Sequence, residues 1–281
     1  MGRLLLVDGS NLLFQMFFGM PARIVNEEGK AIQGTLGFVG ALLKIVRMTR
    51  STHLAVIFDG EHENPRAMLD AEYKANRPDY AEVPEEENPF AQLPDVYAAL
   101  DYLAICHTET QTCETDDVIA AYALRYGQEY DIVISSIDSD FFQLISEHVT
   151  VLRYRGKNTV LCTPGYIRDR LGILPAQYVW FKSLTGDAAD HIKGVPGVGP
   201  KTAARLLREF GTLEGIIANA ARISRPAVRS AIESSVQRLR LNERLIRLDA
   251  AAALPFAPEE LRWEPGGATA AGVLRGIGLK P

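Results

Sequence analysis

The chain has 281 residues, with 30 Lys and Arg against 35 Asp and Glu, so its formal net charge is −5. Apolar residues make up 47% and charged residues 23%, which is typical of a globular protein with a substantial core. This composition excludes collagen-like, disulfide-scaffold and largely disordered proteins. The net acidity alone argues against a nucleic-acid partner, but the distribution of the charges matters more than their sum.

The three cysteines, Cys106, Cys113 and Cys162, form no Cys-x-x-Cys pair, so we expect reduced thiols and a cytoplasmic protein. The apolar run at the N-terminus ends at Asp8 and is too short for the core of a signal peptide. No stretch approaches the ~18 uninterrupted apolar residues of a membrane span, so none is expected.

Short apolar runs alternate with helical patterns in the first part of the chain. Three of these runs each end at an aspartate: 3–7 at Asp8, 54–58 at Asp59 and 131–137 at Asp138. Runs without polar alternation are typical of parallel strands buried on both faces. The helical patterns lie at 34–50, 90–103, 114–127 and 139–146. This alternation predicts an α/β fold whose ligand site lies at the carboxyl ends of the strands.

The second part of the chain has a different pattern. From about Trp180 it is all-helical, with helices expected at 201–208, 212–219 and 226–247. We therefore expect an α/β domain over 1–178, a helical domain over 179–255 and a tail over 256–281. Residues 60–95 form a long connection inside the first domain, which we expect to be helical in its first half and functional.

Acidic residues from five segments converge on the predicted edge of the sheet. They are Asp8, Asp59, Glu114, Asp116, Asp117, Asp138, Asp140, Asp187 and Asp190. Nine unpaired carboxylates in one cleft would repel each other and raise their own pKa values, and bound divalent cations would offset this repulsion. Oxygen ligands without His or Cys indicate Mg²⁺ or Mn²⁺ rather than zinc. Two such ions roughly 3.5–4 Å apart are typical of phosphoryl-transfer enzymes.

Each acid taken alone has an ordinary structural explanation. A single Asp after a strand is most often a helix N-cap, and the Asp-Gly pairs at 8–9 and 59–60 are common in turns. The convergence of five segments favours the metal site over this alternative.

A glycine-rich segment, Gly194-Val-Pro-Gly-Val-Gly199-Pro-Lys201-Thr202, follows a predicted helix. It is not a P-loop, because Pro200 separates the last glycine from the lysine and no strand precedes it. We interpret it as a helix–hairpin–helix turn that holds a phosphodiester through backbone N–H groups. Lys201, Arg205 and Arg208 would add phosphate contacts that do not depend on base sequence. The alternative is a plain turn between packed helices.

Local charge supports nucleic-acid binding. Residues 191–248 hold eleven Lys and Arg against four Asp and Glu, a local charge of +7. Setting the nine carboxylates aside leaves 30 bases against 26 acids in the whole chain. The connection adds a basic, partly aromatic stripe that consists of Arg66, Tyr73, Lys74 and Arg77. Such a stripe would guide single-stranded nucleic acid. The alternative explanation is that these residues form the solvated face of a helix.

Together these motifs resemble the bacterial and phage 5′-3′ exonuclease and flap endonuclease family, which includes the N-terminal nuclease domain of bacterial DNA polymerase I. In the family's order they are Leu6-Val-Asp8-Gly, Phe58-Asp59-Gly, Tyr73-Lys74-x-x-Arg77-Pro, Glu114-x-Asp116-Asp117, Asp138-x-Asp140, Leu184-Thr-Gly-Asp187-x-x-Asp190 and the glycine-rich turn. The resemblance covers about residues 1–250. It implies a resolvase-like (PIN-like) nuclease domain with a helical arch at about 60–95, plus a helix–hairpin–helix (helix-3-turn-helix) domain that grips duplex DNA.

The resemblance also implies the roles of site residues. One Mg²⁺ or Mn²⁺ would be held by Asp8, Asp59, Glu114, Asp116 and Asp117, and the other by Asp138, Asp140, Asp187 and Asp190. Lys74 and Arg77 would position the scissile phosphate beside these acids, and Phe14 and Tyr73 would stack on unpaired bases. Further DNA contacts would come from Arg66, Gly197, Gly199, Lys201, Thr202 and Arg205. A K⁺ ion would bind backbone carbonyls near Val195, Val198 and Lys201.

Two positions depart from the family pattern, Ser139 where many relatives have Lys and His191 where Asn is usual. Neither removes a carboxylate. We expect a monomeric, standalone bacterial enzyme that cuts DNA with 5′ ends or 5′ flaps during replication and repair. The alternatives are a PIN-type ribonuclease and a non-catalytic, structure-specific DNA-binding protein.

Overall fold

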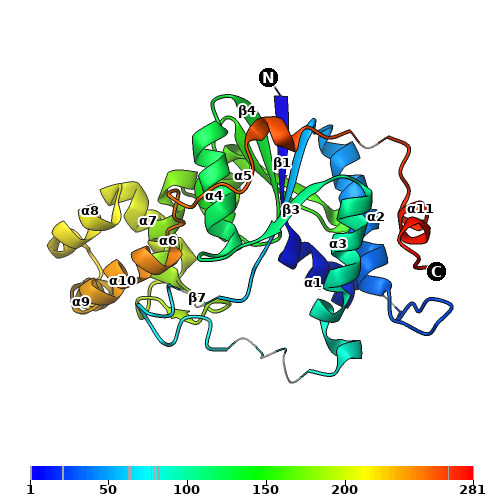
Figure 1. Ribbon diagram of the computed structural model, residues 1–281. Helices are drawn as coiled ribbons and strands as arrows, with labels where there is room; N and C mark the ends of the chain where they lie inside the picture. Colours follow the sequence, from blue (N-terminus) through cyan, green and yellow to red (C-terminus); the bar gives the residue numbers. More distant parts are fainter. Residues whose placement is uncertain are drawn as a thin grey trace.

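The computed structural model describes residues 2–20, 22–62, 65–76, 78, 80, 83–264 and 266–280. A twisted sheet of six strands forms the centre of the first domain (Figure 1). The strand order is β3-β2-β1-β4-β5-β6. The strands are β1 (Gly2–Asp8), β2 (His53–Phe58), β3 (Cys106–Glu109), β4 (Tyr130–Ser135), β5 (Val149–Arg153) and β6 (Val160–Cys162). All pair in parallel except β6, which runs antiparallel to β5.

Helices cover both faces of this sheet, as the fully apolar strands predict. Leu5 and Val7 of β1 pack into a core with α1 (Gly9–Gly19), α2 (Gln33–Thr49) and α3 (Leu93–Tyr102). Leu4 and Leu6 face the opposite core, which includes α4 (Thr115–Tyr126) and α5 (Pro164–Leu171). Side chains that alternate between two buried faces need an apolar residue at every position, which explains the unbroken apolar runs.

The helical domain begins at α6 (Tyr178–Thr185) and shares the core on the α4 side of the sheet. It continues through a short ribbon of β7 (Gly186–Asp187) and β8 (Ile192–Lys193) to α7 (Pro200–Phe210) and α8 (Leu213–Ala218). The predicted helix over 226–247 is in fact two helices, α9 (Pro226–Ser234) and α10 (Val236–Ile246). They are separated at Ser235, whose ψ of 6° departs from helical geometry.

Two predicted helices are wrong. Residues 139–146 contain a short 3₁₀ turn, Asp140–Leu144, because the Asp138 side chain accepts a hydrogen bond from the Asp140 backbone N–H at 2.9 Å. Residues 65–76 form successive turns instead of a helix. Asp70 bonds the Glu72 backbone N–H in the same local way, and Lys74 has φ +56°, which no right-handed helix accommodates. Later in the connection only two 3₁₀ turns are described, Glu85–Glu87 and Pro89–Gln92.

The segment after residue 255 returns to the first domain. Trp263 donates its indole N–H to the Leu103 carbonyl at 2.7 Å and its backbone N–H to the Thr52 carbonyl at 3.0 Å. Its last helix, α11 (Ala270–Gly276), packs against α2 and α3, on the side of the molecule away from the helical domain (Figure 1). The expected C-terminal tail is therefore a folded part of the sheet domain. Within the described ranges, none of the helices has the length and apolar character needed to cross a membrane.

Candidate active site

The first group of carboxylates lies where β1, β2 and β4 end. Asp8 closes β1 and caps α1, accepting a hydrogen bond from the Asn11 backbone N–H at 3.0 Å. Its other oxygen accepts a hydrogen bond from the Ser136 hydroxyl at 2.8 Å. The same hydroxyl accepts the Asp138 backbone N–H at 3.0 Å, so it ties the ends of two strands together. The capping explanation for Asp8 is thus correct, but it leaves lone pairs on both oxygens for a cation.

Asp59 joins the start of α4 to this group. Its carboxylate accepts a hydrogen bond from the Thr115 backbone N–H at 3.0 Å, which fixes the first turn of α4 beside β2. That turn places Asp116 close enough to Asp138 and Asp8 for their charges to raise its pKa well above the usual value, in addition to the larger effect of its burial. Asp8, Asp59, Asp116 and Asp138 therefore come together as predicted.

The pKa of Asp8 shows how unfavourable this arrangement is without a counter-charge. Burial, and next the negative charge of Asp59, raise the pKa of Asp8 to about 7. Among the described residues, none of these four aspartates forms an ion pair with a basic side chain. A divalent cation would supply the missing positive charge.

A second group of carboxylates consists of Asp140, Asp187 and Asp190. One oxygen from each lies within 4.8 Å of the others. Burial, followed by the charge of Asp138, raises the pKa of Asp140 to about 8. Its Oδ1 atom is buried and accepts no hydrogen bond from any described residue, so it remains available to a ligand. Three oxygen donors, the raised pKa of Asp140 and its buried oxygen without a hydrogen bond together fit a hard divalent cation such as Mg²⁺ or Mn²⁺.

Glu114 lies at the edge of the first group and is held by the 65–76 turns. The Tyr73 hydroxyl donates a hydrogen bond to Glu114 Oε2 at 3.2 Å, and the Lys74 ammonium bonds Glu114 Oε1. Lys74 also lies over the Tyr73 ring, 4.9 Å from its centroid. Tyr73 is buried, so in this structure it is a support for Glu114 and not an exposed platform for a base. Arg77 lies outside the described residues.

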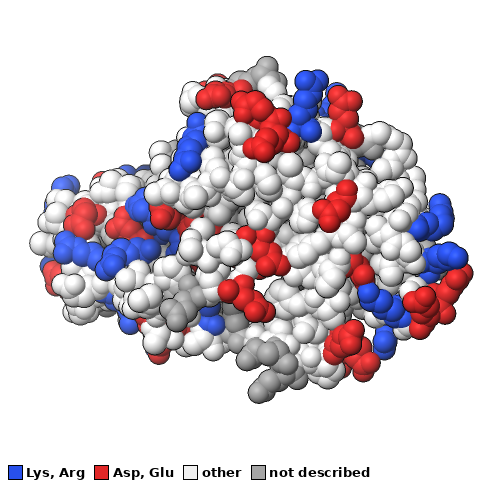
Figure 2. Space-filling model, viewed as in Figure 1, with Lys and Arg blue, Asp and Glu red and all other residues white. Residues whose placement is uncertain are grey.

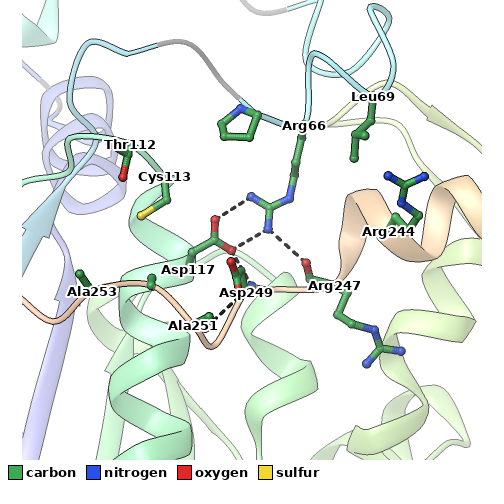
Figure 3. A pocket seen from close by; sticks show the side chains of 12 residues that line it. Arg66, Leu69, Thr112, Cys113, Asp117, Arg244, Arg247, Asp249, Ala251 and Ala253 are labelled. Carbon is green, nitrogen blue, oxygen red and sulfur yellow. Dashed lines mark hydrogen bonds and ion pairs between the residues drawn. The ribbon is translucent and has the colours of Figure 1, made fainter.

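Arg66 and Asp117 have a different role from the one expected. Arg66 is buried and donates two hydrogen bonds to Asp117, at 2.6 and 2.9 Å, and one to Glu114 at 2.6 Å. It also bonds the Arg247 carbonyl at 3.1 Å, and Asp117 accepts the Asp249 backbone N–H at 2.8 Å (Figure 3). Arg66 therefore supplies the counter-charge of Asp117 and links the connection to the segment after α10, and its burial removes it from the exposed basic stripe that we expected.

A cavity of about 530 Å³ lies beside this ion pair. Figure 3 shows the Arg66–Asp117 pair in its wall, with Arg244 and Arg247 coming from α10 and the residue that follows it. Cys113 also lines the cavity.

The base of the connection rests on the loop that carries Asp187 and Asp190. The Lys74 backbone N–H bonds the Asp190 carbonyl at 3.0 Å, and the His191 ring bonds the Glu72 carbonyl at the same distance. Lys193 forms an ion pair with the Glu72 carboxylate at 2.8 Å. His191, the position that departs from the family pattern, has φ +58°. Asn and His tolerate this left-handed region better than most residues, so a His in place of the family's usual Asn is compatible with the backbone at this position.

The glycine-rich turn has the geometry expected of a tight hairpin. A Cβ atom at Gly194 would lie 2.3 Å from the Thr185 carbonyl carbon, so only glycine fits there, and Gly197 has φ +76°. Gly199 precedes α7, where Pro200 occupies the first helical position. Figure 2 shows Lys and Arg side chains gathered over the helical domain. The surface residues at the start of α7 are Lys201 and Arg205, which are exposed, and Thr202, which is half-buried.

Phe14 belongs to a partly exposed cluster of aromatic side chains. Its ring meets the rings of Tyr80 and Phe90 edge-on, with centroids 5.2 Å away in each case, and Phe18 lies next to it. Phe18 is 60% exposed and Phe90 38% exposed. The far end of the connection therefore packs on α1. Sequence reasoning found Phe14 but missed its neighbours, although residues 14 and 18 lie one helical turn apart.

Lys182 is the other residue that sequence reasoning missed. Its ammonium lies 3.6 Å from Asp140 Oδ1 and bonds Asp187. Burial alone would lower the pKa of Lys182, but Asp140 and Asp187 raise it above its usual value, so the side chain stays charged. Lys182 lies five residues before Asp187, and no sequence motif marked it.

Comparisons with known proteins agree with this geometry. Residues 3–172 match the family model of the 5′-3′ exonuclease N-terminal resolvase-like domain, and residues 173–268 match the 5′-3′ exonuclease C-terminal SAM fold. The resolvase-like α/β domain and the helical second domain expected from the sequence are thereby confirmed.

Curated relatives include the thermostable DNA polymerase I of Thermus thermophilus, 34% identical over 88% of this chain and 29% of the relative. The DNA polymerase I of Rhizobium leguminosarum is 34% identical over 93% of this chain and 26% of the relative. The chain thus spans less than a third of the length of these relatives.

Solved structures share the fold. The T5 5′-exonuclease with bound zinc has a TM-score of 0.73 at 23% identity, covering 87% of this chain and 89% of that one. The catalytic core of Rad2 in complex with a DNA substrate has a TM-score of 0.59 at 17% identity, covering 98% of this chain and 93% of that one.

Proposed function

The chain belongs to the 5′-3′ exonuclease family, and on that premise we propose that it is a divalent-metal-dependent 5′-3′ exonuclease and flap endonuclease acting on DNA. One observation carries this proposal: two groups of buried carboxylates face one sheet edge without enough positive charge to balance them. Such an imbalance destabilises the protein unless cations bind. The expected role is the removal of flaps or RNA primers in replication and repair.

The two groups supply the ligands of two metal ions. Asp8, Asp59, Asp116 and Asp138 would hold one ion together with Glu114, and Asp140, Asp187 and Asp190 would hold the other. Asp117 is better assigned to the Arg66 ion pair. When bound, Mg²⁺ or Mn²⁺ at such a pair of sites activates water and stabilises the leaving oxygen.

The chain's own residues orient these ligands and neutralise the substrate. Ser136 holds Asp8, the N-terminus of α4 holds Asp59, and Tyr73 holds Glu114. The Lys74 ammonium lies at the edge of the first group, where it would contact the scissile phosphate and offset the charge that develops there. We expect Arg77 to assist it.

The helical domain would bind the duplex part of the substrate. Gly197, Gly199, Lys201, Thr202 and Arg205 surround the hairpin, and its backbone N–H groups suit a phosphodiester. We propose that a K⁺ ion binds the backbone carbonyls near Val195, Val198 and Lys201. Duplex affinity should then be higher in K⁺ than in Li⁺ at equal ionic strength. We also propose that Phe14 contacts unpaired bases.

A cleavage assay tests the function directly. A labelled 5′-flap DNA and the same structure made of RNA are incubated with Mg²⁺ or with EDTA, using the wild type and Asp138→Ala. The DNA should be cut by the wild type with Mg²⁺, and neither with EDTA nor by the variant. Asp131→Ala is the matched control, because Asp131 lies near the start of β4, at the opposite end from Asp138, and pairs with His148. Binding without cleavage would indicate the non-catalytic alternative, and cleavage of RNA alone would indicate the ribonuclease.

A further inference from the structure

Lys182 places a permanent positive charge inside the second group of carboxylates. It lies on α6 with its side chain 12% exposed, bonded to Asp187 and 3.6 Å from Asp140 Oδ1. The neighbouring residues Phe181, Ser183 and Leu184 are buried, so packing fixes the backbone of the helix that carries the lysine.

We propose that the Lys182 ammonium is a resident counter-ion of the second metal site, which a divalent cation must displace in order to bind. This inference rests on the proposed function, because it assumes that Asp140, Asp187 and Asp190 hold a metal ion. It assigns Lys182 the role of weakening and delaying metal binding at that site.

The geometry makes the two cations mutually exclusive. Three carboxylate oxygens within 4.8 Å of one another surround a single space for a cation. A metal there would use oxygens of Asp140 and Asp187, the two groups that the ammonium contacts. Two positive charges at such short range would repel each other strongly in a buried setting, so the flexible lysine side chain is the part that must move away.

The basic side chains of the first group lie at its edge and not between the four aspartates. Lys74 and Arg66 pair with Glu114 at its edge, while Asp8, Asp59, Asp116 and Asp138 have no ionic partner in the described part of the chain. We therefore expect the first group to bind a divalent ion at lower concentration than the second. Neutralising Lys182 should reduce this difference.

Metal binding without DNA tests the inference. Free Mn²⁺ is measured by electron paramagnetic resonance during titration of the wild type, Lys182→Met and Lys193→Met. Lys193 is the control, because it pairs with Glu72 and not with the three carboxylates. The weaker binding event should tighten at least about tenfold in Lys182→Met and stay unchanged in Lys193→Met. Adding Asp187→Asn to Lys182→Met should abolish the tightened event, which assigns it to the second site.

Thermal unfolding provides a second measurement. Removal of the ammonium leaves the carboxylates uncompensated, so metal-free Lys182→Met should melt lower than the wild type and gain more in Tm from Mn²⁺. If Lys182→Met does not fold, Lys182→Gln replaces it in both experiments. If Lys182→Met binds Mn²⁺ at the weaker site no more tightly than the wild type does, the inference about Lys182 is wrong, while the proposed function still stands. Failure of every protein, including the wild type, to bind Mn²⁺ would overturn the proposed function as well.

Discussion

The backbone N–H of Lys74 donates a hydrogen bond to the carbonyl of Asp190 at 3.0 Å, so a residue expected to contact the phosphate rests on the loop of the second metal site. The contact joins segments 116 positions apart in the chain, and Asn76 adds another to the Ala188 carbonyl at 3.3 Å. These two hydrogen bonds tie the base of the connection to the loop that holds Asp187 and Asp190.

The first prediction concerns His191, which bonds the Glu72 carbonyl from a left-handed backbone position. His191→Gly removes this bond but suits the backbone, whereas His191→Ala removes the same bond and must adopt φ +58°. We expect the alanine variant to be less stable than the glycine variant by about 1 kcal/mol. Urea unfolding measures the difference. Hydrogen exchange over 72–76 should accelerate in both variants, and unchanged exchange would show that the bond does not hold the connection.

The second prediction concerns the buried guanidinium of Arg66. Arg66→Met leaves the buried Asp117 carboxylate without this counter-charge and leaves Glu114 with Lys74, so the free energy of unfolding should fall by about 3 kcal/mol. Arg247→Met is the control, since that exposed side chain forms a single ion pair among the described residues, with Glu243, and it should change stability by less than about 1 kcal/mol. Chemical unfolding of the metal-free proteins measures the free energy of unfolding of both variants and of the wild type. Equal stability of the two variants would contradict a buried, structural Arg66.

The aspartates at the sheet edge could be predicted because fully buried parallel strands are unbroken apolar runs and the acid that ends each run is conspicuous. The separation of Asp117 from Asp116 follows from helix geometry. Successive residues of a helix point about 100° apart, so both side chains cannot face the same ion from the first turn of α4. The linear motif Glu114-x-Asp116-Asp117 does not show this difference in direction, so we expected both aspartates at the same ion.

Three other features could not be predicted from the sequence pattern. Strand β3 is the polar segment Cys106–Glu109 at the sheet edge, with none of its residues fully buried, so it lacks the apolar signal of the central strands. The pairing of Lys182 with Asp140 depends on how α6 packs on the sheet domain, which local sequence does not encode. The local sequence of residues 65–76 is compatible with a helix, which is why we expected one there. Tertiary contacts override this preference, and the bond from Lys74 to the Asp190 carbonyl accompanies a backbone φ of +56° at Lys74.

The third prediction concerns pH and metal. In the folded, metal-free protein Asp8 has a pKa of about 7 and Asp140 of about 8, against about 3.8 in the unfolded chain. The folded state therefore binds more protons at intermediate pH. The stabilisation is present at acidic pH and is lost as pH rises through 7 and 8. We expect the free energy of unfolding to fall by more than about 1 kcal/mol from about pH 6 to pH 9.

Millimolar Mg²⁺ should remove most of this fall, because the ion takes the place of the protons. Urea unfolding across the pH series, with Mg²⁺ and with EDTA, measures both effects. Asp8→Asn is the matched variant and should lose the part of the slope that ends near pH 7. The same slope with and without Mg²⁺ would mean that the ion does not bind these carboxylates.

The last prediction concerns Lys201, exposed at the start of α7 beside the hairpin. If the hairpin holds a phosphodiester, Lys201→Ala removes one phosphate contact and leaves the fold intact. Duplex affinity should fall several-fold, and the slope of log affinity against log salt should decrease by about 1. Fluorescence anisotropy with labelled duplex over a salt series measures both quantities. Lys157→Ala, at an exposed turn after β5 in the sheet domain, is the charge-matched control and should retain the wild-type slope. An equal loss in both variants would indicate a diffuse effect of net charge, and the hairpin would then not be the site of duplex contact.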